Sequence, residues 1–277
     1  MEPTILIPAN SAPGEQLHEL LPKWRLRLDP NSVPGLVHGR NGKNRKYVTQ
    51  EDVAHRVGFS TRWYANLERG VKGAYSLSFL DEVASILQLS AEERAVLYML
   101  AAGHEPEPPR AVPVGPQFEA LRAIVDAQPW PAYVSDDAWD CLFSNEDHLR
   151  WFPHLRYEPN IMLWPFLYKE SRIQLINWER DWARPMLAQL RAASARHPDN
   201  ARLQEIIQRI LTGSPDARRI WDEKAEVHLH PDGDRRLMHV PYFSGPREIE
   251  IVALTTLRAL GFRVMMLIPV DEMRARS

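Results

Sequence analysis

One stretch, residues 49–70, constrains the fold more than any other, because it predicts two short helices joined by a glycine turn. Val53 and Val57 follow the spacing of one helix face. Gly58 stands where a chain leaving a helix often takes a positive φ. Ser60 then offers a hydroxyl group that can cap the next helix. The stretch therefore predicts a helix-turn-helix.

The second helix of this pair is expected to have one buried face and one polar face. Tyr64 and Leu67 fall on the buried face. The outward side chains can all hydrogen-bond to another molecule, and they are Thr61, Arg62 and Asn66. A helical hairpin without any nucleic-acid role is the alternative interpretation.

Positive charge gathers around the same stretch. Residues 39–73 contain eight Lys or Arg and three acidic residues, a net charge of +5, whereas the whole chain of 277 residues carries −2. The cluster includes a basic segment that starts at Arg40 and ends at Lys46. A charge cluster is usually only a solvated surface, but here it coincides with the motif. We therefore expect a phosphate-binding patch.

Further helices are predicted on both sides of the motif, giving five in the first hundred residues. Leu17 to Leu28 carry an amphipathic pattern, and Leu77 to Leu87 carry another. Ser90 and Glu93 form a capping-box pattern that starts a last helix. Proline-rich segments then divide the chain into a mobile tail (1–15), a helical domain (16–104), a linker (105–116) and a second domain (117–271).

The second half mixes short strands with helices. Strands are predicted over 132–135, 139–144, 226–231, 237–243, 248–254 and 263–269, and helices over 118–127, 145–152, 161–167, 171–197, 201–211 and 216–222. Pro185 should kink or break the longest helix. Strands that come early and late around a helical middle predict an α+β domain with an antiparallel sheet.

Aromatic side chains are concentrated in this second half. Six of the nine tryptophans lie between Trp130 and Trp182. Such residues can line an adaptable apolar pocket, although each one taken alone is more often a plain core residue. The candidate ligand-binding residues are Trp139, Met162, Phe166, Trp178, Trp182, Met186 and Arg180, with Arg172 and Arg184 as further candidates for an acidic head group.

Other functions find little support. The single cysteine, Cys141, allows no intramolecular disulfide, and no apolar run is long enough to span a bilayer. We find no signal peptide and no phosphate-binding loop, nucleophile elbow or zinc-protease motif, and so expect a cytoplasmic protein without cofactor or catalytic site. A metal-dependent enzyme would have to use the alternating residues Glu226, His228 and His230.

Two family resemblances can be named on these residues. Gln50, Ala54, the turn 57–60 and the ending 67–70 resemble the helix-turn-helix of XRE/Cro-type repressors. Residues 17–270 are similar to MmyB-like transcription regulators, on the features Pro129–Val134, Asn145, Asp181–Trp182, the 201–211 helix followed by Trp221, and His239.

The resemblances imply a bacterial-type, homodimeric transcription factor with a PAS-like ligand-binding domain. Its partners would be operator DNA and a small hydrophobic effector, for example a fatty acid. The implied DNA-binding residues are Gln50, Ser60, Thr61, Arg62, Trp63, Asn66, Arg69, Lys72, Arg45 and Lys46. There are two alternative functions: a helix-turn-helix used for protein interaction, and a DNA-binding domain fused to an enzyme.

Overall fold

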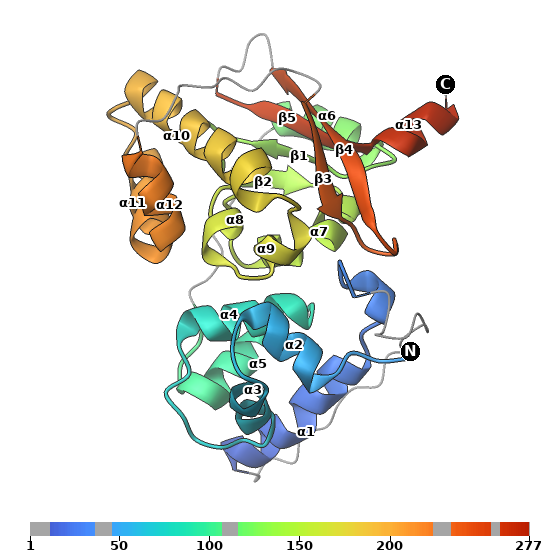
Figure 1. The fold of residues 1–277 in the computed structure, drawn as a ribbon, viewed down its shortest axis with the longest axis vertical. Helices are drawn as coiled ribbons and strands as arrows, with labels where there is room; N and C mark the ends of the chain where they lie inside the picture. Colours follow the sequence, from blue (N-terminus) through green and yellow to red (C-terminus); the bar gives the residue numbers. More distant parts are fainter. Residues whose placement is uncertain (1–11, 37–45, 107–115, 224–233, 256–260, 277) are drawn as a thin grey trace.

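The computed structural model describes residues 12–36, 46–106, 116–223, 234–255 and 261–276. Figure 1 shows a helical half that lies against a half built from helices and a sheet. This arrangement confirms the expected all-α and α+β parts of the chain. Among the described helices, none combines the length and the apolar character needed to cross a membrane.

The helical half contains the five helices expected from the sequence. They are α1 (Pro13–Leu26), α2 (Gln50–Val57), α3 (Thr61–Glu68), α4 (Leu77–Ile86) and α5 (Ala91–Ala102), with a short 3₁₀ turn η1 (Pro30–Ser32) after α1. The first helix begins at Pro13, inside the segment predicted as a tail, because proline suits the first turn of a helix.

The α2–α3 pair has the local geometry that the sequence predicts. Gly58 adopts φ +66° and ends α2, a conformation that costs glycine little. The Ser60 hydroxyl accepts the Trp63 backbone N–H at 3.2 Å and caps α3. Tyr64 and Leu67 are fully buried. The turn and both helices are therefore fixed by their own sequence.

Glu68 joins the first three helices through buried polar contacts. Its carboxylate accepts hydrogen bonds from Arg25 Nε at 2.7 Å and from Gln50 Nε2 at 2.6 Å. Arg25 also donates to the backbone carbonyl of Val48 at 2.8 Å. Since Glu68 is only 2% exposed, removing any of these donors would leave a buried charge less well satisfied.

The second half is organised around one antiparallel sheet with the strand order β2-β1-β5-β4-β3. Its strands are β1 (Ala132–Ser135), β2 (Cys141–Ser144), β3 (Asp234–His239), β4 (Pro246–Thr255) and β5 (Arg263–Pro269). Its helical elements are α6 (Pro116–Asp126), α7 (Glu146–Trp151), η2 (Pro153–Arg156), α8 (Trp164–Leu167), α9 (Ser171–Gln174), η3 (Trp178–Ala183), α10 (Arg184–Arg196), α11 (Ala201–Gly213), α12 (Pro215–Asp222) and α13 (Val270–Arg276).

The predicted long helix over 171–197 is the main correction. The chain leaves α9 at Leu175, which pairs with Met238 of the edge strand β3. Asn177 then takes φ +52°, the turn η3 is π-helical, and α10 follows with Pro185 in its first turn. The break therefore lies at Leu175–Asn177, whereas Pro185 lies where the π-helical turn passes into α10.

Three strands also have other bounds than predicted: β3 begins at Asp234 and β4 at Pro246, each earlier than expected. The second strand starts at Cys141 rather than Trp139, because Trp139 has φ +63° and belongs to the preceding turn. The edge strand β3 ends at His239 instead of reaching residue 243, because Pro241 cannot donate to a ladder. The predicted strand over 226–231 lies outside the described residues.

The two faces of the sheet contact different helices. Along β1, Tyr133 belongs to a large core that the sheet shares with the helices α7–α12, and its neighbours Ala132 and Val134 belong to a smaller core. The smaller core also includes Phe118 of α6, which lies on the opposite face. This alternation follows from the strand geometry, in which successive side chains point to opposite faces.

Asn145 holds three segments of this half together. Its side-chain oxygen accepts the backbone N–H of Ala132 at 3.1 Å and that of His148 at 3.0 Å. Its amide group donates to the carbonyl of Trp130 at 2.8 Å. Asn145 therefore caps α7 and fixes the start of β1 with a side chain that is 5% exposed.

The two halves meet through Tyr157 and Glu170. Tyr157 is buried among residues of the helical half, and its hydroxyl donates to the carbonyl groups of Leu89 and Ala84. The Glu170 carboxylate accepts the hydroxyl of Ser85, on α4, at 2.8 Å. Figure 1 shows α8 and α9 on the side of the sheet domain that faces α2 and α4.

Replacing Asn145 by alanine should lower the free energy of unfolding by about 2–4 kcal/mol, because several buried backbone groups lose their partner. Asn200→Ala is the matched control: Asn200 caps α11 with one bond to Leu203 N, and its loss should cost about 1 kcal/mol. Urea denaturation measures both. Equal losses would show that the buried contacts of Asn145 add nothing to an ordinary cap.

Candidate functional site

The outer face of α3 presents polar side chains to solvent, as the sequence predicts. Thr61 and Arg62 are exposed, and Trp63 and Asn66 are partly exposed. The exposed Ser60 caps the same helix, so this polar face starts at a capped helix N-terminus. Because Tyr64 and Leu67 are buried on the opposite face, α3 is held with its polar face toward solvent.

Some of the expected DNA contacts are engaged within the protein. Arg69 donates to the side chain of Asn66, so these two residues face the same surface as a pair. Gln50 is bonded to Glu68 and is partly buried, which gives it a structural role at the start of α2. Arg45 lies outside the described residues.

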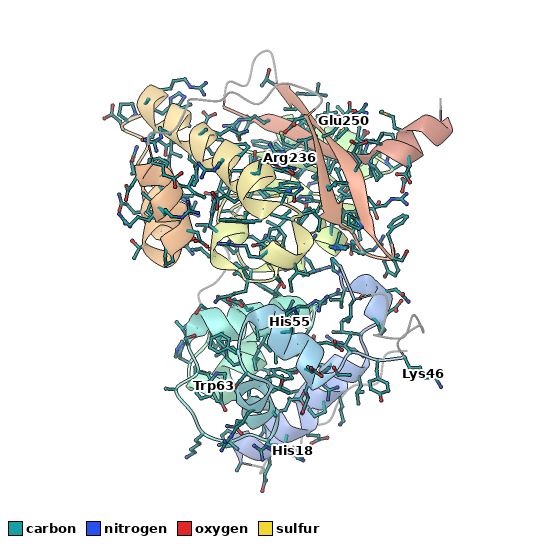
Figure 2. All side chains as sticks on the ribbon, in the orientation of Figure 1. His18, Lys46, His55, Trp63, Arg236 and Glu250 are labelled. Atoms are coloured by element: carbon teal, nitrogen blue, oxygen red, sulfur yellow. The ribbon has the colours of Figure 1, made fainter. Side chains whose placement is uncertain are left out.

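Four basic side chains of the charged cluster are accessible, whereas Arg56 of α2 is buried. Lys46, Arg62, Arg69 and Lys72 are all exposed. Figure 2 shows Lys46 extending from the surface of the helical half. Arg62 lies on α3 and Arg69 caps its C-terminus, so these two exposed cations adjoin the polar face and suit contacts with a phosphate backbone.

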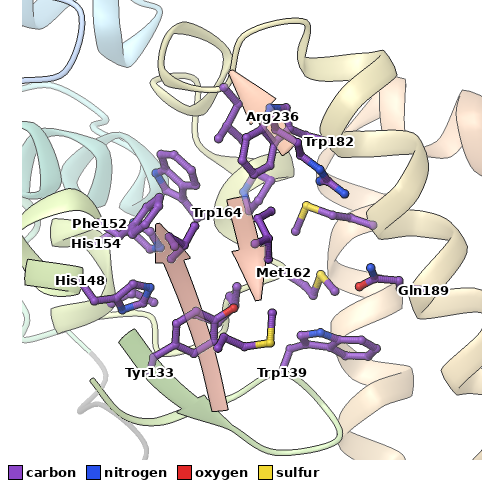
Figure 3. Close-up of a pocket in the computed structure, with 18 residues that line it drawn as sticks. Tyr133, Trp139, His148, Phe152, His154, Met162, Trp164, Trp182, Gln189 and Arg236 are labelled. Atoms are coloured by element: carbon purple, nitrogen blue, oxygen red, sulfur yellow. The ribbon is translucent and has the colours of Figure 1, made fainter. Parts of the chain in front are cut away.

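The second site is a cavity of about 110 Å³ between the sheet and the helices of the second half. Figure 3 shows the side chains around it. The cavity has room for more than a single water molecule. Its lining is Tyr133, Trp139, His148, Phe152, His154, Leu155, Ile161, Met162, Trp164, Pro165, Leu175, Trp182, Met186, Gln189, Arg236, Ile251, Met265 and Leu267.

Polar groups in this lining are few and lie among aromatic rings. The Arg236 guanidinium lies 4.9 Å from the centre of the Trp182 ring and is bonded to Asp234 at 2.7 Å. Gln189 is a second polar lining residue (Figure 3). Within the described residues, Trp182 Nε1 is buried without a hydrogen-bond partner. A mostly apolar cavity with a few polar groups is typical of a small-molecule site.

Two histidines of the cavity wall are buried and neutral. His148 stacks on Tyr133 with ring centroids 4.4 Å apart, and His154 stacks on Trp164 at 4.9 Å with nearly parallel rings. Burial lowers the pKa of His148 to about 3, and burial also lowers the pKa of His154 well below its ordinary value. Both imidazole rings therefore act as flat, uncharged walls at neutral pH.

The predicted ligand-binding residues divide into two groups. Trp139, Met162, Trp182 and Met186 line the cavity. Phe166 and Trp178 pack on each other outside it, with ring centroids 5.9 Å apart. The side chain of Arg180 is 76% exposed and paired with Asp181, so it points away from the cavity.

The other proposed cations for a head group also lie outside the lining. Arg172 is paired with Asp216 and lies over Trp178, and Arg184 is paired with Glu179 and Glu223. Arg236 is the guanidinium that lines the cavity, and the sequence analysis missed it. Arg236 and Met238 are both buried and share one face of β3, while Leu237 is exposed, so strand alternation would have grouped Arg236 with Met238 if the predicted strand had begun before residue 237.

The metal alternative receives no support from the described part of the chain. In that part, no group of three His, Cys, Asp or Glu side chains could hold a metal ion. Glu226, His228 and His230 lie outside the described residues. His239 is partly buried, and its Nδ1 contacts no described hydrogen-bond partner.

Comparison with protein families finds two matches. Residues 118–276, more than half of the chain, match the MmyB-like transcription regulator ligand binding domain, and this range contains the entire cavity lining. Residues 40–97 match a helix-turn-helix domain, and this range contains α2 and α3. A search of curated proteins returned no match for the chain.

Acidification should destabilise the fold through the two buried histidines. In the unfolded chain these imidazoles bind protons below about pH 6.5, whereas in the folded protein they stay neutral. The free energy of unfolding should therefore be highest near pH 7 and fall as the pH drops toward 5. His154→Phe keeps a ring on Trp164 and should reduce that fall by about 2 kcal/mol. Urea denaturation at pH 7 and pH 5 measures it. The exposed His197→Phe is the control, and identical behaviour of the two variants would contradict the prediction.

Proposed function

The chain belongs to the family that carries the MmyB-like transcription regulator ligand binding domain, and on this premise we propose that a small hydrophobic ligand in the cavity controls sequence-specific DNA binding by α3. Both matching families are regulatory, and a ligand-responsive transcription regulator accounts for the two sites together. The observation that carries the proposal is their combination: an accessible polar helix with basic neighbours, and an aromatic cavity with a lining guanidinium.

On the DNA side, α3 would enter the major groove. Arg62 suits the O6 and N7 acceptors of guanine, and Asn66 suits the N6 and N7 groups of adenine. Thr61 lies beside them, whereas Lys46 and Lys72 would contact phosphates and set the register. Asn66 would exchange its contact with Arg69 for the base, so Arg69 would become free for a phosphate.

On the ligand side, we propose a small molecule with an apolar body and an acidic head, of which a fatty acid is one example. Trp139, Met162, Trp182 and Met186 would contact the body, and methionine side chains adapt readily to such shapes. Arg236 would attract the head in place of Arg180. A long chain would need these side chains to move, because the cavity measures about 110 Å³.

The protein would act as a homodimer, since two reading helices about 34 Å apart fit successive turns of DNA. A ligand would favour one arrangement of the two helices over another. A helix-turn-helix used only to bind proteins remains the second candidate function, and it predicts no salt-dependent DNA binding.

Two substitutions separate base contacts from phosphate contacts. On a duplex selected from a random library by the full-length protein, Arg62→Ala should cost about 1–3 kcal/mol and relax the preference at one base position. Lys46→Ala should reduce the salt dependence by about one phosphate contact and leave the preference intact. Fluorescence anisotropy titrations at several salt concentrations measure both. Uniform loss on all sequences with Arg62→Ala would reassign this residue to phosphate binding.

The ligand proposal is tested by native and denaturing mass spectrometry of the purified full-length protein. A small molecule that adds mass in the native spectrum and is lost on denaturation is the expected result, and the native mass also gives the number of subunits. An Arg236→Met variant serves as comparison and should lose an acidic ligand. A bare native mass for the unaltered protein would speak against a tightly held ligand.

A further inference from the structure

Trp164 belongs to the cavity and to the domain boundary at once. Its ring lines the cavity, where His154 stacks on it at 4.9 Å and the ring of Phe152 meets it edge-on at 5.3 Å. Its indole N–H donates to Glu170 Oε1 at 2.8 Å. Trp164 therefore contacts both the cavity and the carboxylate of Glu170 at the domain boundary, so a change in the cavity can reach Glu170 through this one side chain.

Glu170 continues this connection into the helical half. The oxygen that accepts the Trp164 N–H also accepts the hydroxyl of Ser85, on α4, at 2.8 Å. The preceding residue, Lys169, lies over the turn between α2 and α3: a Cβ atom added to Gly58 would lie 2.6 Å from Lys169 Cδ. One short segment thus contacts α4 and the turn before α3.

We propose that Trp164, Glu170 and Ser85 form the route by which occupancy of the cavity alters the helix-turn-helix. This inference rests on the proposed function and assigns its regulation to named positioning residues. A molecule larger than the present space displaces wall side chains, and Trp164 cannot shift without changing its bond to Glu170. The changed bond alters how Glu170 holds Ser85 and how Lys169 covers Gly58.

The surroundings of Glu170 make its bonds costly to lose. Glu82 of α4 is 6% exposed, and burial raises its pKa to about 9, with the nearby Glu170 carboxylate adding to the effect. Burial also raises the pKa of Glu170, against the lowering effect of its bonds from Trp164 and Ser85 and of the positive charge of Arg56. Since burial disfavours the charged form of Glu170, this form depends on the donors Trp164 and Ser85.

Tyr157 provides a contrasting contact. It crosses the same boundary and bonds to the carbonyl groups of Leu89 and Ala84, yet it is not part of the cavity lining. The contact through Trp164, Glu170 and Ser85 thus touches the cavity wall, and the Tyr157 contact does not. Comparing the two separates a specific route from a general weakening of the boundary.

The test uses hydrogen–deuterium exchange of the full-length protein, read at the amides of α4 (residues 77–86). Trp164→Phe keeps the ring in the cavity wall and removes the donor, and Ser85→Ala removes the partner donor on α4. Each should speed exchange there roughly fivefold, the effect of one net hydrogen bond. The double variant should add little to either single variant, because both act on one carboxylate.

A bound ligand is then imitated by a larger side chain that fills the cavity. Ile251→Phe fills the cavity from β4, far along the chain from α4, and Met265→Phe does so from β5 if the first variant fails to fold. The filled variant should change α4 exchange in the native background and in the Tyr157→Phe background. It should leave α4 exchange unaltered once Trp164→Phe or Ser85→Ala is also present.

Three results would overturn the proposal: no response of α4 to filling, the same response with and without Trp164→Phe, or a response abolished only by Tyr157→Phe. Exchange is measured without DNA, so these outcomes are independent of whether α3 binds DNA. A protein that transmits filling to α4 but binds no duplex would refute the proposed function and retain the route. A protein that binds the duplex but shows no response of α4 to filling would support DNA binding and refute the route.

Discussion

A partly buried carboxyl group needs hydrogen-bond donors, and this requirement at Glu170 ties the two halves of the protein together. Trp164 supplies one donor from the sheet domain and Ser85 supplies another from the helical domain. Neither half satisfies the group as fully alone, so the relative position of the halves is set by polar contacts as well as by the burial of Tyr157. Polar contacts of this kind are directional, and they hold one arrangement more narrowly than apolar packing does.

The helical half follows its sequence closely because its signals are local. Gly58, Ser60 and the Ser90–Glu93 capping box each act within one turn of chain, and the structure contains all three as predicted. The sheet domain was predicted in class and strand direction, but its middle section was not. A single long helix over 171–197 satisfied the apolar pattern, whereas pairing of Leu175 with β3 and the αL turn at Asn177 depend on partners far along the chain.

The residues that line the cavity could also be predicted only in part. Composition located the aromatic cluster, and four of its predicted members line the cavity, but spacing alone could not tell Trp182, which faces the cavity, from Trp178, which faces Phe166. Two residues of the wall, His148 and His154, gave no sequence signal because histidine is intermediate in burial, so its presence alone predicts neither a buried nor an exposed position. Arg236 could have been recognised from strand alternation, had the start of β3 been placed earlier.

The strand order has a consequence for how the chain acquires its shape. The first strand, β1, pairs on one side with its neighbour β2 and on the other with β5, with Ala132 opposite Met266. Contacts between such distant segments form slowly, since a long loop must close before they add stability. During synthesis the helical half can fold once it has left the ribosome, whereas the sheet cannot form until its central strand, β5, has been synthesised. A nascent chain therefore holds a finished helix-turn-helix before it holds the cavity that we expect to govern it.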